Sequence, residues 1–348
     1  MMEFLPSVEQ VSSVIREEAM LQWNDRTKPI GSLGRLEQLT ADLCAIQGSL
    51  TPATSPRVVV LFAADHGVAR LGVSAYPQEV TWQMAANFVA GGAAINVLSR
   101  YQHANLEVVD VGIAGDPVPG VLNRRVRPGT RNFLESTAMT EEEMHRAIAV
   151  GIERANSSAA NGAVIAVAGE MGIGNTASAA ALLCLLTDAD PQNAVGRGTG
   201  VDDAGLKHKR QVVQQGITRH EACRNDAGAA LAAVGGLEIA ALCGFYIGAA
   251  ANKMMVMVDG FICTVAALTA CQLVPAVREY LQFAHCSAEQ GHALALKALD
   301  AKPLLTLDMR LGEGSGAALA LSLVDASVLL FLQMATFSKA GVSTAEEH

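Results

Sequence analysis

The chain has 348 residues, of which 51% are hydrophobic and only 17% are charged. This composition excludes a disordered protein, because it supplies enough apolar surface for a core, and the length predicts about two domains. The formal net charge of −9 excludes the overall excess of cations that a duplex-binding surface requires. We therefore expect no nucleic-acid partner.

Seven cysteines occur without a CxxC pair, and the N-terminus lacks the basic and apolar regions of a secretory leader. We therefore expect a cytoplasmic protein with reduced thiols. Two long uncharged stretches, residues 239–252 and 260–277, are rich in Gly, Ala, Cys and Thr. They are no longer than the roughly 20 apolar residues of a membrane span, so no membrane partner is expected either.

Residues 7–50 have helical spacing, with Ser7 as the predicted N-cap of the first helix. Five short apolar runs follow, and the segments between them have helical spacing, for example residues 79–98. The runs cover residues 58–63, 106–111, 163–168, 254–258 and 280–283. Short apolar runs that alternate with helices indicate parallel strands buried on both faces. We therefore predict an α/β fold with a doubly wound, mainly parallel, Rossmann-like sheet.

The two ends of the chain contain few strand-like runs, and residues 315–338 predict a long C-terminal helix. We expect residues 1–50 and about 315–348 to form a smaller helical domain, and residues 51–314 to form the α/β catalytic domain. Ligands bind beyond the carboxyl ends of the strands in doubly wound sheets. Glycines and acidic residues follow several of the predicted strands, so we expect the site at this edge.

A glycine-rich turn, residues 169–176, follows the third predicted strand and precedes an alanine-rich helix. Its glycines allow backbone N–H groups to approach a ligand, and Asn175 or Thr176 can cap the helix. The N-terminus of that helix favours a phosphate. A purely structural tight turn explains the same residues equally well. The GxxxxGK[ST] pattern of nucleotide triphosphatases is absent.

A second glycine-rich segment, residues 196–200, is followed by two aspartates and then by Lys207, Lys209 and Arg210. Alternating glycines with nearby cations are typical of an anion site. A structural loop fits the same pattern. A dinucleotide-binding fingerprint would have to follow a strand, and residues 188–192 do not predict one.

The third segment, residues 309–316, places Glu313 among three glycines and just before a predicted helix. One interpretation is a carboxylate that interacts with the helix dipole, worth at most about 1 kcal/mol. The other is a general base in a glycine-walled pocket, where burial raises the pKa of the carboxyl group. In that case Glu170 and Glu313 face one cavity.

The sequence lacks the motifs that would indicate a metal site or an α/β-hydrolase. The eight histidines show no HxxxH or HxH spacing, so we expect no metal, and His66 is expected to be a hydrogen-bonded loop residue. No GxSxG pattern occurs, which disfavours an α/β-hydrolase. No cofactor is expected.

Taken together, the motifs resemble one family. In order along the chain they are residues 27–37 (TKPIGSLGRLE), 64–68 (ADHGV), 72–77 (GVSAYP), 109–113 (VDVGI), 169–176, 275–277 (PAV), 285–289 (HCSAE) and 310–316 (RLGEGSG). From about residue 20 to 335 the chain resembles the nicotinate-nucleotide:dimethylbenzimidazole phosphoribosyltransferase family. That family acts in the nucleotide-loop assembly of cobalamin.

The resemblance implies a pentosyl transfer. Nicotinate mononucleotide releases nicotinate, and a benzimidazole nitrogen takes its place with inversion, which yields α-ribazole 5′-phosphate. The nicotinate leaving group already carries a pyridinium charge, so no metal is needed to activate it. The resemblance also implies a homodimer and a small helical domain built from both termini.

The resemblance further assigns roles to individual residues. Glu313 is implied as the general base and Glu170 as a second active-site carboxylate. The residues implied to bind the phosphate and ribose are Gly172, Gly174, Asn175, Thr176, Gly198, Lys209, Ser287 and Arg310. The residues implied to form the benzimidazole pocket are Tyr76, Met84, Met171 and Leu311. Some family members have a serine and a glutamine where this chain has Tyr76 and Met84, so the choice among benzimidazoles, adenine and phenolics stays open.

Two alternatives to this activity stay open at this point. The first is an NAD(P)-dependent oxidoreductase that uses the loop at residues 196–200. The second is a non-catalytic binder of nicotinate nucleotides, which would bind its ligand without releasing nicotinate.

Overall fold

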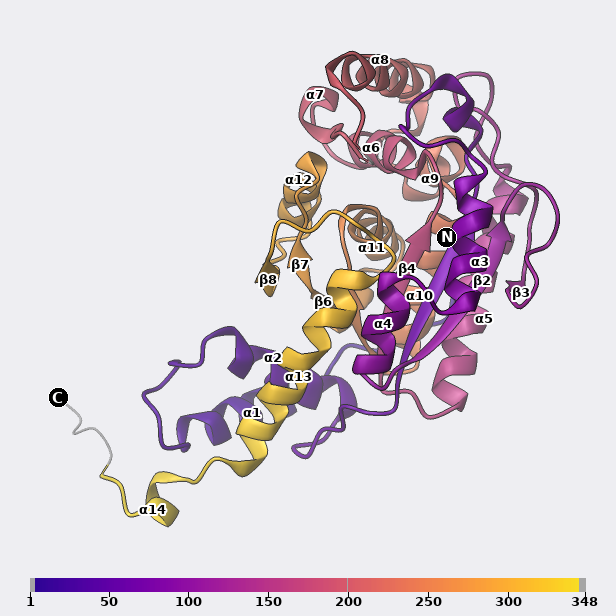
Figure 1. Cartoon of the computed structure of the whole chain (residues 1–348). Coiled ribbons are helices and arrows are strands. Elements are labelled where there is room, and N and C mark those ends of the chain that lie inside the picture. The colour runs from indigo at the N-terminus through magenta and orange to yellow at the C-terminus, as the bar shows by residue number, and fades with distance from the viewer. Residues whose placement is uncertain (1–3, 199, 344–348) are drawn as a thin grey trace.

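The computed structural model describes residues 4–198 and 200–343, and its largest element is a six-stranded parallel sheet (Figure 1). The strand order is β3-β2-β1-β4-β5-β6, which is the doubly wound Rossmann order and confirms the predicted fold class. The strands are β1 (Arg57–Ala64), β2 (Asn105–Gly112), β3 (Leu122–Asn123), β4 (Ile165–Met171), β5 (Met255–Val258) and β6 (Leu281–Phe283).

Helices cover both faces of this sheet, because right-handed crossovers place their helices on one face where the strands progress from β1 to β3 and on the other where they progress from β4 to β6. One set packs on β1, β2, β4 and β5: α3 (Val80–Ala90), α4 (Ala94–Tyr101) and α13 (Ser315–Gln333). The opposite set is α5 (Glu141–Ala160), α10 (Leu237–Ala251) and α11 (Phe261–Leu273). With helices on both sides, the central strands are buried along nearly their whole length.

The remaining elements surround this sandwich. The longer helices are α6 (Asn175–Leu186), α8 (Asp203–Arg219), α9 (Ala227–Val234) and α12 (Gln290–Ala298). Short elements are α7 (Pro191–Ala194), α14 (Phe337–Ala340), the 3-10 turns η1 (Gly67–Leu71), η2 (Glu221–Cys223) and η3 (Pro275–Tyr280), and the parallel pair β7 (His285–Cys286) and β8 (Leu305–Thr306).

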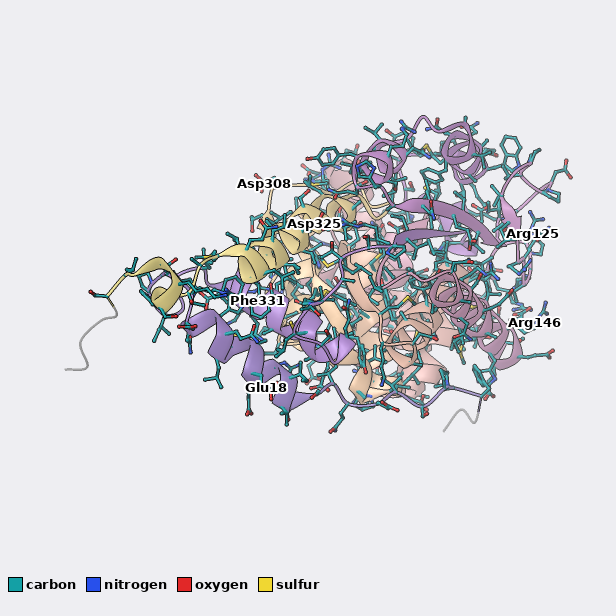
Figure 2. The ribbon with its side chains drawn as sticks, turned by 90° about the horizontal axis from the view of Figure 1, so that it is seen from below. Glu18, Arg125, Arg146, Asp308, Asp325 and Phe331 are labelled. Atoms are coloured by element: carbon teal, nitrogen blue, oxygen red, sulfur yellow. The ribbon has the colours of Figure 1, made fainter. Side chains whose placement is uncertain are left out.

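Helices α1 (Ser13–Asn24) and α2 (Arg35–Gln47) form a second, smaller core with the C-terminal part of α13. Trp23 and Phe331 are fully buried there, and their ring centroids lie 5.3 Å apart. Figure 2 shows Phe331 at the end of the molecule opposite to Arg125 and Arg146. This packing is the one we expected between the N-terminal helices and the C-terminal helix.

Helix α13 joins the two cores, because its N-terminal part packs against β4 and β5 and its C-terminal part against α2 (Figure 1). We therefore propose that the helical domain, residues 1–50 and about 315–348, shares this helix with the α/β domain, residues 51–314. Residues 1–3 and 344–348 of that assignment lie outside the described part of the chain. Helix α13 is also long and apolar enough to cross a membrane by length and composition, but 56% of its most apolar window is buried inside the protein.

Three sequence predictions differ from the structure. The first helix begins at Ser13, and its N-cap is Ser12, whose Oγ accepts a hydrogen bond from Ile15 N at 3.2 Å, so Ser7 is not the cap. The single helix predicted over residues 79–98 is two helices, because Gly91 has a left-handed φ of 82° that ends α3. Strand β3 was missed because its two residues carry no detectable pattern.

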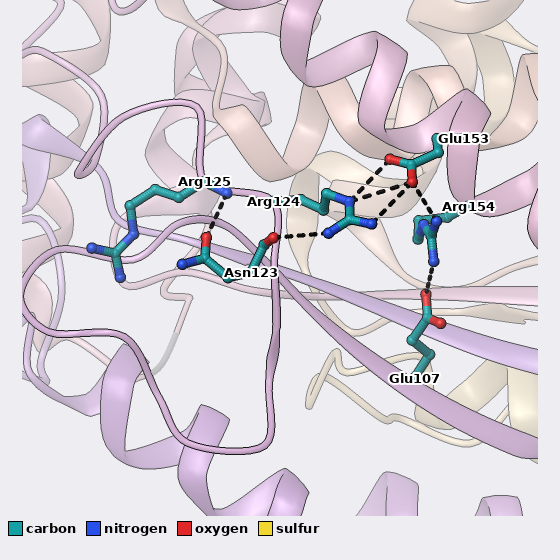
Figure 3. A network of polar contacts seen from close by, with 6 residues as sticks. All are labelled: Glu107, Asn123, Arg124, Arg125, Glu153 and Arg154. Carbon is teal, nitrogen blue, oxygen red and sulfur yellow. Dashed lines mark hydrogen bonds and ion pairs between the residues drawn. The ribbon is translucent and has the colours of Figure 1, made fainter.

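The sheet edge at β2 and β3 is covered by a network of charged side chains (Figure 3). The Arg124 guanidinium donates to both oxygens of Glu153, and Arg154 joins Glu153 to Glu107 with N–O distances of 2.6 and 3.5 Å. These ion pairs tie α5 to the edge strands. Charged side chains at a sheet edge also discourage pairing with a strand of another molecule.

The contact between α5 and α10 depends on glycines. A Cβ at Gly151 would overlap the carbonyl oxygen of Ala241, and a Cβ at Gly244 would overlap that of Ile148. The two helix backbones therefore approach more closely than any larger residue allows. This close approach holds α10 against α5 and the rest of the sandwich.

Gly151→Ala is expected to lower the free energy of unfolding by about 1–3 kcal/mol, because the added methyl group overpacks the contact between α5 and α10. Urea denaturation followed by circular dichroism measures the change. Ala149→Ser lies on the exposed side of the same helix and serves as the control, with an expected change below about 0.5 kcal/mol. A Gly151→Ala protein as stable as the wild type would contradict this account of the contact.

Candidate active site

A cavity lies beyond the carboxyl ends of β4, β5 and β6, at the edge where doubly wound sheets bind ligands. It is lined by segments that follow these strands and by the turn before α13. Ten of the fourteen predicted site residues line it: Glu170, Met171, Gly172, Asn175, Thr176, Gly198, Ser287, Arg310, Leu311 and Glu313. The structure therefore brings together sequence segments that are far apart in the chain.

The other four predicted site residues do not line this cavity. Lys209 lies behind it and contacts Thr176, and Gly174 lies in the turn before α6. Tyr76 is 54% exposed, and Met84 is half-buried on α3. Half of the benzimidazole pocket that the resemblance implied is therefore absent from the wall of this cavity.

The turn after β4 is tight because its glycines touch neighbouring backbone. A Cβ at Gly172 would overlap the carbonyl oxygen of Ala64, and Gly174 has a left-handed φ of 95°. Gly174 is the N-cap of α6, and no side chain caps this helix. The prediction that Asn175 or Thr176 caps it is wrong, because the Asn175 amide donates to Glu170 Oε2 at 2.5 Å instead.

Glu170 is 6% exposed, and its surroundings disfavour the charged form. Burial raises the pKa of Glu170 to about 8, and the nearby carboxylates of Glu238 and Asp259 contribute to the rise. Hydrogen bonds from Asn175 and from the backbone N–H of Glu313 oppose it. Glu170 therefore carries a proton over much of the neutral range while it contacts the turn that bears Glu313.

Glu313 has a φ of 66°, between Gly312 at 84° and Gly314 at 87°. A side chain in this left-handed region costs roughly 1–2 kcal/mol, and such strain gathers at functional sites. Glu313 is 6% exposed, its Oε2 has no hydrogen-bond partner among the described residues, and burial raises the pKa of its carboxyl group. A backbone hydrogen bond from Ile95 to the carboxylate opposes the rise. The predicted raised pKa is confirmed in direction, and a buried carboxylate with one unpartnered oxygen is a suitable proton acceptor.

Asp259, at the end of β5, holds the N-terminus of α13 and so the position of Glu313. Its two carboxylate oxygens accept hydrogen bonds from Gly314 N at 3.1 Å and from Ala317 N at 2.9 Å. Gly314 is the N-cap of α13 and has no side chain to do this. His285 Nε2 lies 3.4 Å from the same carboxylate. The sequence showed Asp259 only as an acidic residue after a strand.

The opposite end of the cavity is cationic. Lys209 is 1% exposed, and its Nζ donates to Thr176 Oγ1 at 2.7 Å and to the Gly196 carbonyl oxygen at 3.3 Å. Burial lowers the pKa of Lys209 to about 8. Arg310 donates to the Gly198 carbonyl oxygen at 3.2 Å. A buried lysine and an exposed arginine beside a helix N-terminus suit a phosphate.

A buried pair lies beneath the turn after β4. His66 Nε2 is 2.6 Å from Glu238 Oε1, and His66 Nδ1 is 2.9 Å from Ser178 Oγ. The predicted role of His66 as a hydrogen-bonded residue is confirmed. Sequence reasoning missed Glu238, although a single charge near the start of the apolar helix α10 was a usable signal.

The chain matches the phosphoribosyltransferase family model over residues 8–342. The sheet order, the strand-end cavity and its cationic end fit that class, so the protein is a phosphoribosyltransferase. More narrowly, the chain belongs to the nicotinate-nucleotide–dimethylbenzimidazole phosphoribosyltransferase family. This assignment favours phosphoribosyl transfer over an NAD(P)-dependent oxidoreductase.

Curated relatives and a solved structure support the family at nearly full length. The enzyme of that name from Geotalea uraniireducens is 46% identical over 346 residues, which cover 99% of this chain and 98% of the relative. The one from Pseudomonas aeruginosa is 49% identical over 331 residues, 94% of each chain. The crystal structure of CobT from Thermus thermophilus superposes with a TM-score of 0.90 at 44% identity, and the match covers 95% of this chain and 99% of that one.

The raised pKa of Glu170 predicts a pH dependence of stability. The folded protein keeps the proton up to about pH 8, whereas the unfolded chain loses it near 4.5. The contribution of protonated Glu170 to the free energy of unfolding is therefore complete below pH 4.5 and is lost as the pH rises through 8. In Glu170→Gln we therefore expect a smaller drop in unfolding free energy between pH 5 and 8.5 than in the wild type.

Urea denaturation at several pH values measures this difference. Glu142→Gln, an exposed glutamate in the first turn of α5, is the matched control and should follow the wild-type profile. Parallel profiles for the wild type and Glu170→Gln would show that Glu170 does not retain its proton in the folded state.

Proposed function

We propose that this protein transfers the phosphoribosyl group of nicotinate mononucleotide to dimethylbenzimidazole, which releases nicotinate and forms α-ribazole 5′-phosphate. Membership of the family supports the reaction class. One observation supports the site in particular. Two buried carboxylates, Glu170 and Glu313, share a cavity with Arg310, and Lys209 lies behind the cavity wall, where it donates to Thr176.

The reaction exchanges one C–N bond for another at the anomeric carbon of the ribose. The unprotonated benzimidazole nitrogen attacks this carbon and forms the new bond. The bond to the nicotinate ring nitrogen breaks, and its electron pair neutralises the pyridinium charge. The N–H proton of the benzimidazole must leave as the other ring nitrogen bonds to the anomeric carbon. Attack from the opposite face inverts the β-riboside to the α-riboside.

Glu313 is the proposed general base for that proton. Burial raises the pKa of Glu313, which makes its carboxylate a stronger base. Its unpartnered Oε2 is free to accept the N–H proton. Glu170 is the proposed neighbour of the ribose. Protonated Glu170 avoids placing a second fixed negative charge beside Glu313, which would raise the pKa of Glu313 further.

The substrate phosphate is proposed to lie at the cationic end of the cavity. The groups available there are the backbone of Gly172, Gly174 and Gly198, the side chains of Asn175, Thr176 and Ser287, and the cations Lys209 and Arg310. The benzimidazole would contact Met171 and Leu311 in the cavity wall. Tyr76 and Met84 would take part only if the segment that carries Tyr76 moves toward the cavity.

Glu313→Gln is expected to lower kcat by about 10²-fold or more while the protein stays folded, because a general base contributes on this scale. Purified protein is mixed with nicotinate mononucleotide and dimethylbenzimidazole, and product mass and nicotinate release are followed by liquid chromatography and mass spectrometry. Glu142→Gln is again the matched control and should retain wild-type activity.

Near-normal turnover of Glu313→Gln would remove Glu313 from the chemistry. Stoichiometric binding of nicotinate mononucleotide without nicotinate release by the wild type would support the non-catalytic binder instead. A panel of benzimidazoles, adenine and phenolics in the same assay identifies the preferred base.

We further propose that the protein is a cytoplasmic homodimer. Val97 and Tyr101 are exposed one turn apart on α4, and Leu329 and Leu332 are exposed on one side of α13. Exposed apolar side chains on one helix face favour association. Sedimentation equilibrium should give about twice the 36.3 kDa chain mass, and a mass of one chain at micromolar concentration would contradict the dimer.

A further inference from the structure

One buried carboxylate in the cavity has no role in the chemistry proposed so far. Glu289 lines the cavity and is only 8% exposed. Its Oε2 is buried and has no hydrogen-bond partner among the described residues. A buried carboxylate oxygen without a hydrogen-bond partner is unfavourable relative to one in water. A ligand that donates hydrogen bonds to it would recover much of this cost.

The local structure holds Glu289 in this position. Its backbone N–H donates to Ser287 Oγ at 3.2 Å, and it is the N-cap residue of α12 without using its side chain as a cap. A Cβ at Gly196 would overlap Glu289 Oε2. The carboxylate therefore fits there only because a glycine faces it.

The charges around Glu289 place it beside the phosphate end of the cavity. Its negative charge raises the pKa of Lys209, opposing the effect of burial. No ion pair with an N–O distance up to 4.0 Å joins Glu289 to a cation in the described residues. Lys209 Nζ is instead bonded to Thr176 Oγ1 and Gly196 O. The carboxylate thus stays free to accept hydrogen bonds from a ligand.

The proposed substrates, on which this inference rests, offer few groups that suit such an acceptor. The phosphate and the nicotinate carboxylate are anionic and would be repelled. The benzimidazole has a single N–H, which belongs to Glu313 in the proposed reaction. The ribose has two hydroxyl groups, and a carboxylate is a common partner of ribose hydroxyls in nucleotide sites.

We propose that Glu289 binds a ribose hydroxyl of the nucleotide substrate and makes the enzyme selective for ribose over deoxyribose. The hydroxyl donates to the carboxylate, which is already buried and oriented before the substrate arrives. The sugar is then fixed between Lys209 at its phosphate and Glu313 at its anomeric carbon. Glu289 is a binding residue in this account and takes no part in proton transfer.

The test compares substrates that differ by one hydroxyl. Wild type, Glu289→Gln and Glu289→Ala are assayed with nicotinate mononucleotide and with its 2′-deoxy and 3′-deoxy analogues. Affinity for each nucleotide alone is measured in parallel by calorimetry. With the ribose substrate, Glu289→Ala should lower affinity and kcat/KM by about 10- to 100-fold, the scale of a hydrogen bond to a charged group. Glu289→Gln should show a smaller loss.

The decisive result is the pattern across substrates. With the analogue that lacks the bound hydroxyl, the wild type and both variants should agree within about twofold. Equal losses of Glu289→Ala on all three nucleotides, or no loss on any, would overturn the proposal. Thermal unfolding of both variants shows whether they fold. If Glu289→Ala fails to fold, Glu289→Gln, which keeps the shape of the side chain, still tests the proposal.

Failure of the proposed function would look different. If the wild type binds the ribonucleotide but releases no nicotinate with any base, the transfer reaction is wrong. The calorimetric comparison of ribose and deoxyribose nucleotides then still decides the role of Glu289. If the wild type binds none of the three nucleotides, both proposals are wrong.

Discussion

The hydrogen bonds from the N-terminus of α13 to Asp259 fix the geometry on which the site depends. They connect the end of β5 to the turn that carries Glu313, a residue held in a left-handed conformation. Without this connection the turn would be free to place Glu313 in a relaxed conformation. A carboxylate that accepts backbone N–H groups from another segment acts as a cap supplied by the tertiary structure. The sheet and α13 therefore position the proposed base jointly.

Several carboxyl groups lie in or beside the cavity, and the pKa of each depends on its surroundings. Glu170 is fully enclosed near Glu238 and Asp259, so its proton is retained. Glu313 is less enclosed, and the pKa of its carboxyl group rises for the same physical reason. At the phosphate end, burial lowers the pKa of Lys209 and the nearby Glu289 carboxylate opposes this effect. Desolvation thus raises the pKa of both carboxyl groups, each to an extent that its own surroundings set.

Much of the architecture could be predicted from local patterns. The apolar runs located five of the six sheet strands, because buried parallel strands are apolar on both faces. The glycine-rich turns located the segments that line the cavity, because backbone that approaches a ligand or another segment closely excludes side chains. Local patterns did not locate β3 or the break after Gly91, since a two-residue strand has no period and single glycines have several uses.

The sequence by itself determined the order of most strands and helices, the positions of the glycine-rich turns and the family resemblance. Only the tertiary structure decided which distant residues meet around the cavity. Asp259 reaches α13 across 55 residues of chain, and His66 reaches Glu238 across 172. Such contacts leave no local pattern, because periodicity reports which face of an element is buried and not which partner buries it. Glu289 gained significance for the same reason, since its burial and its missing partner exist only in the folded chain.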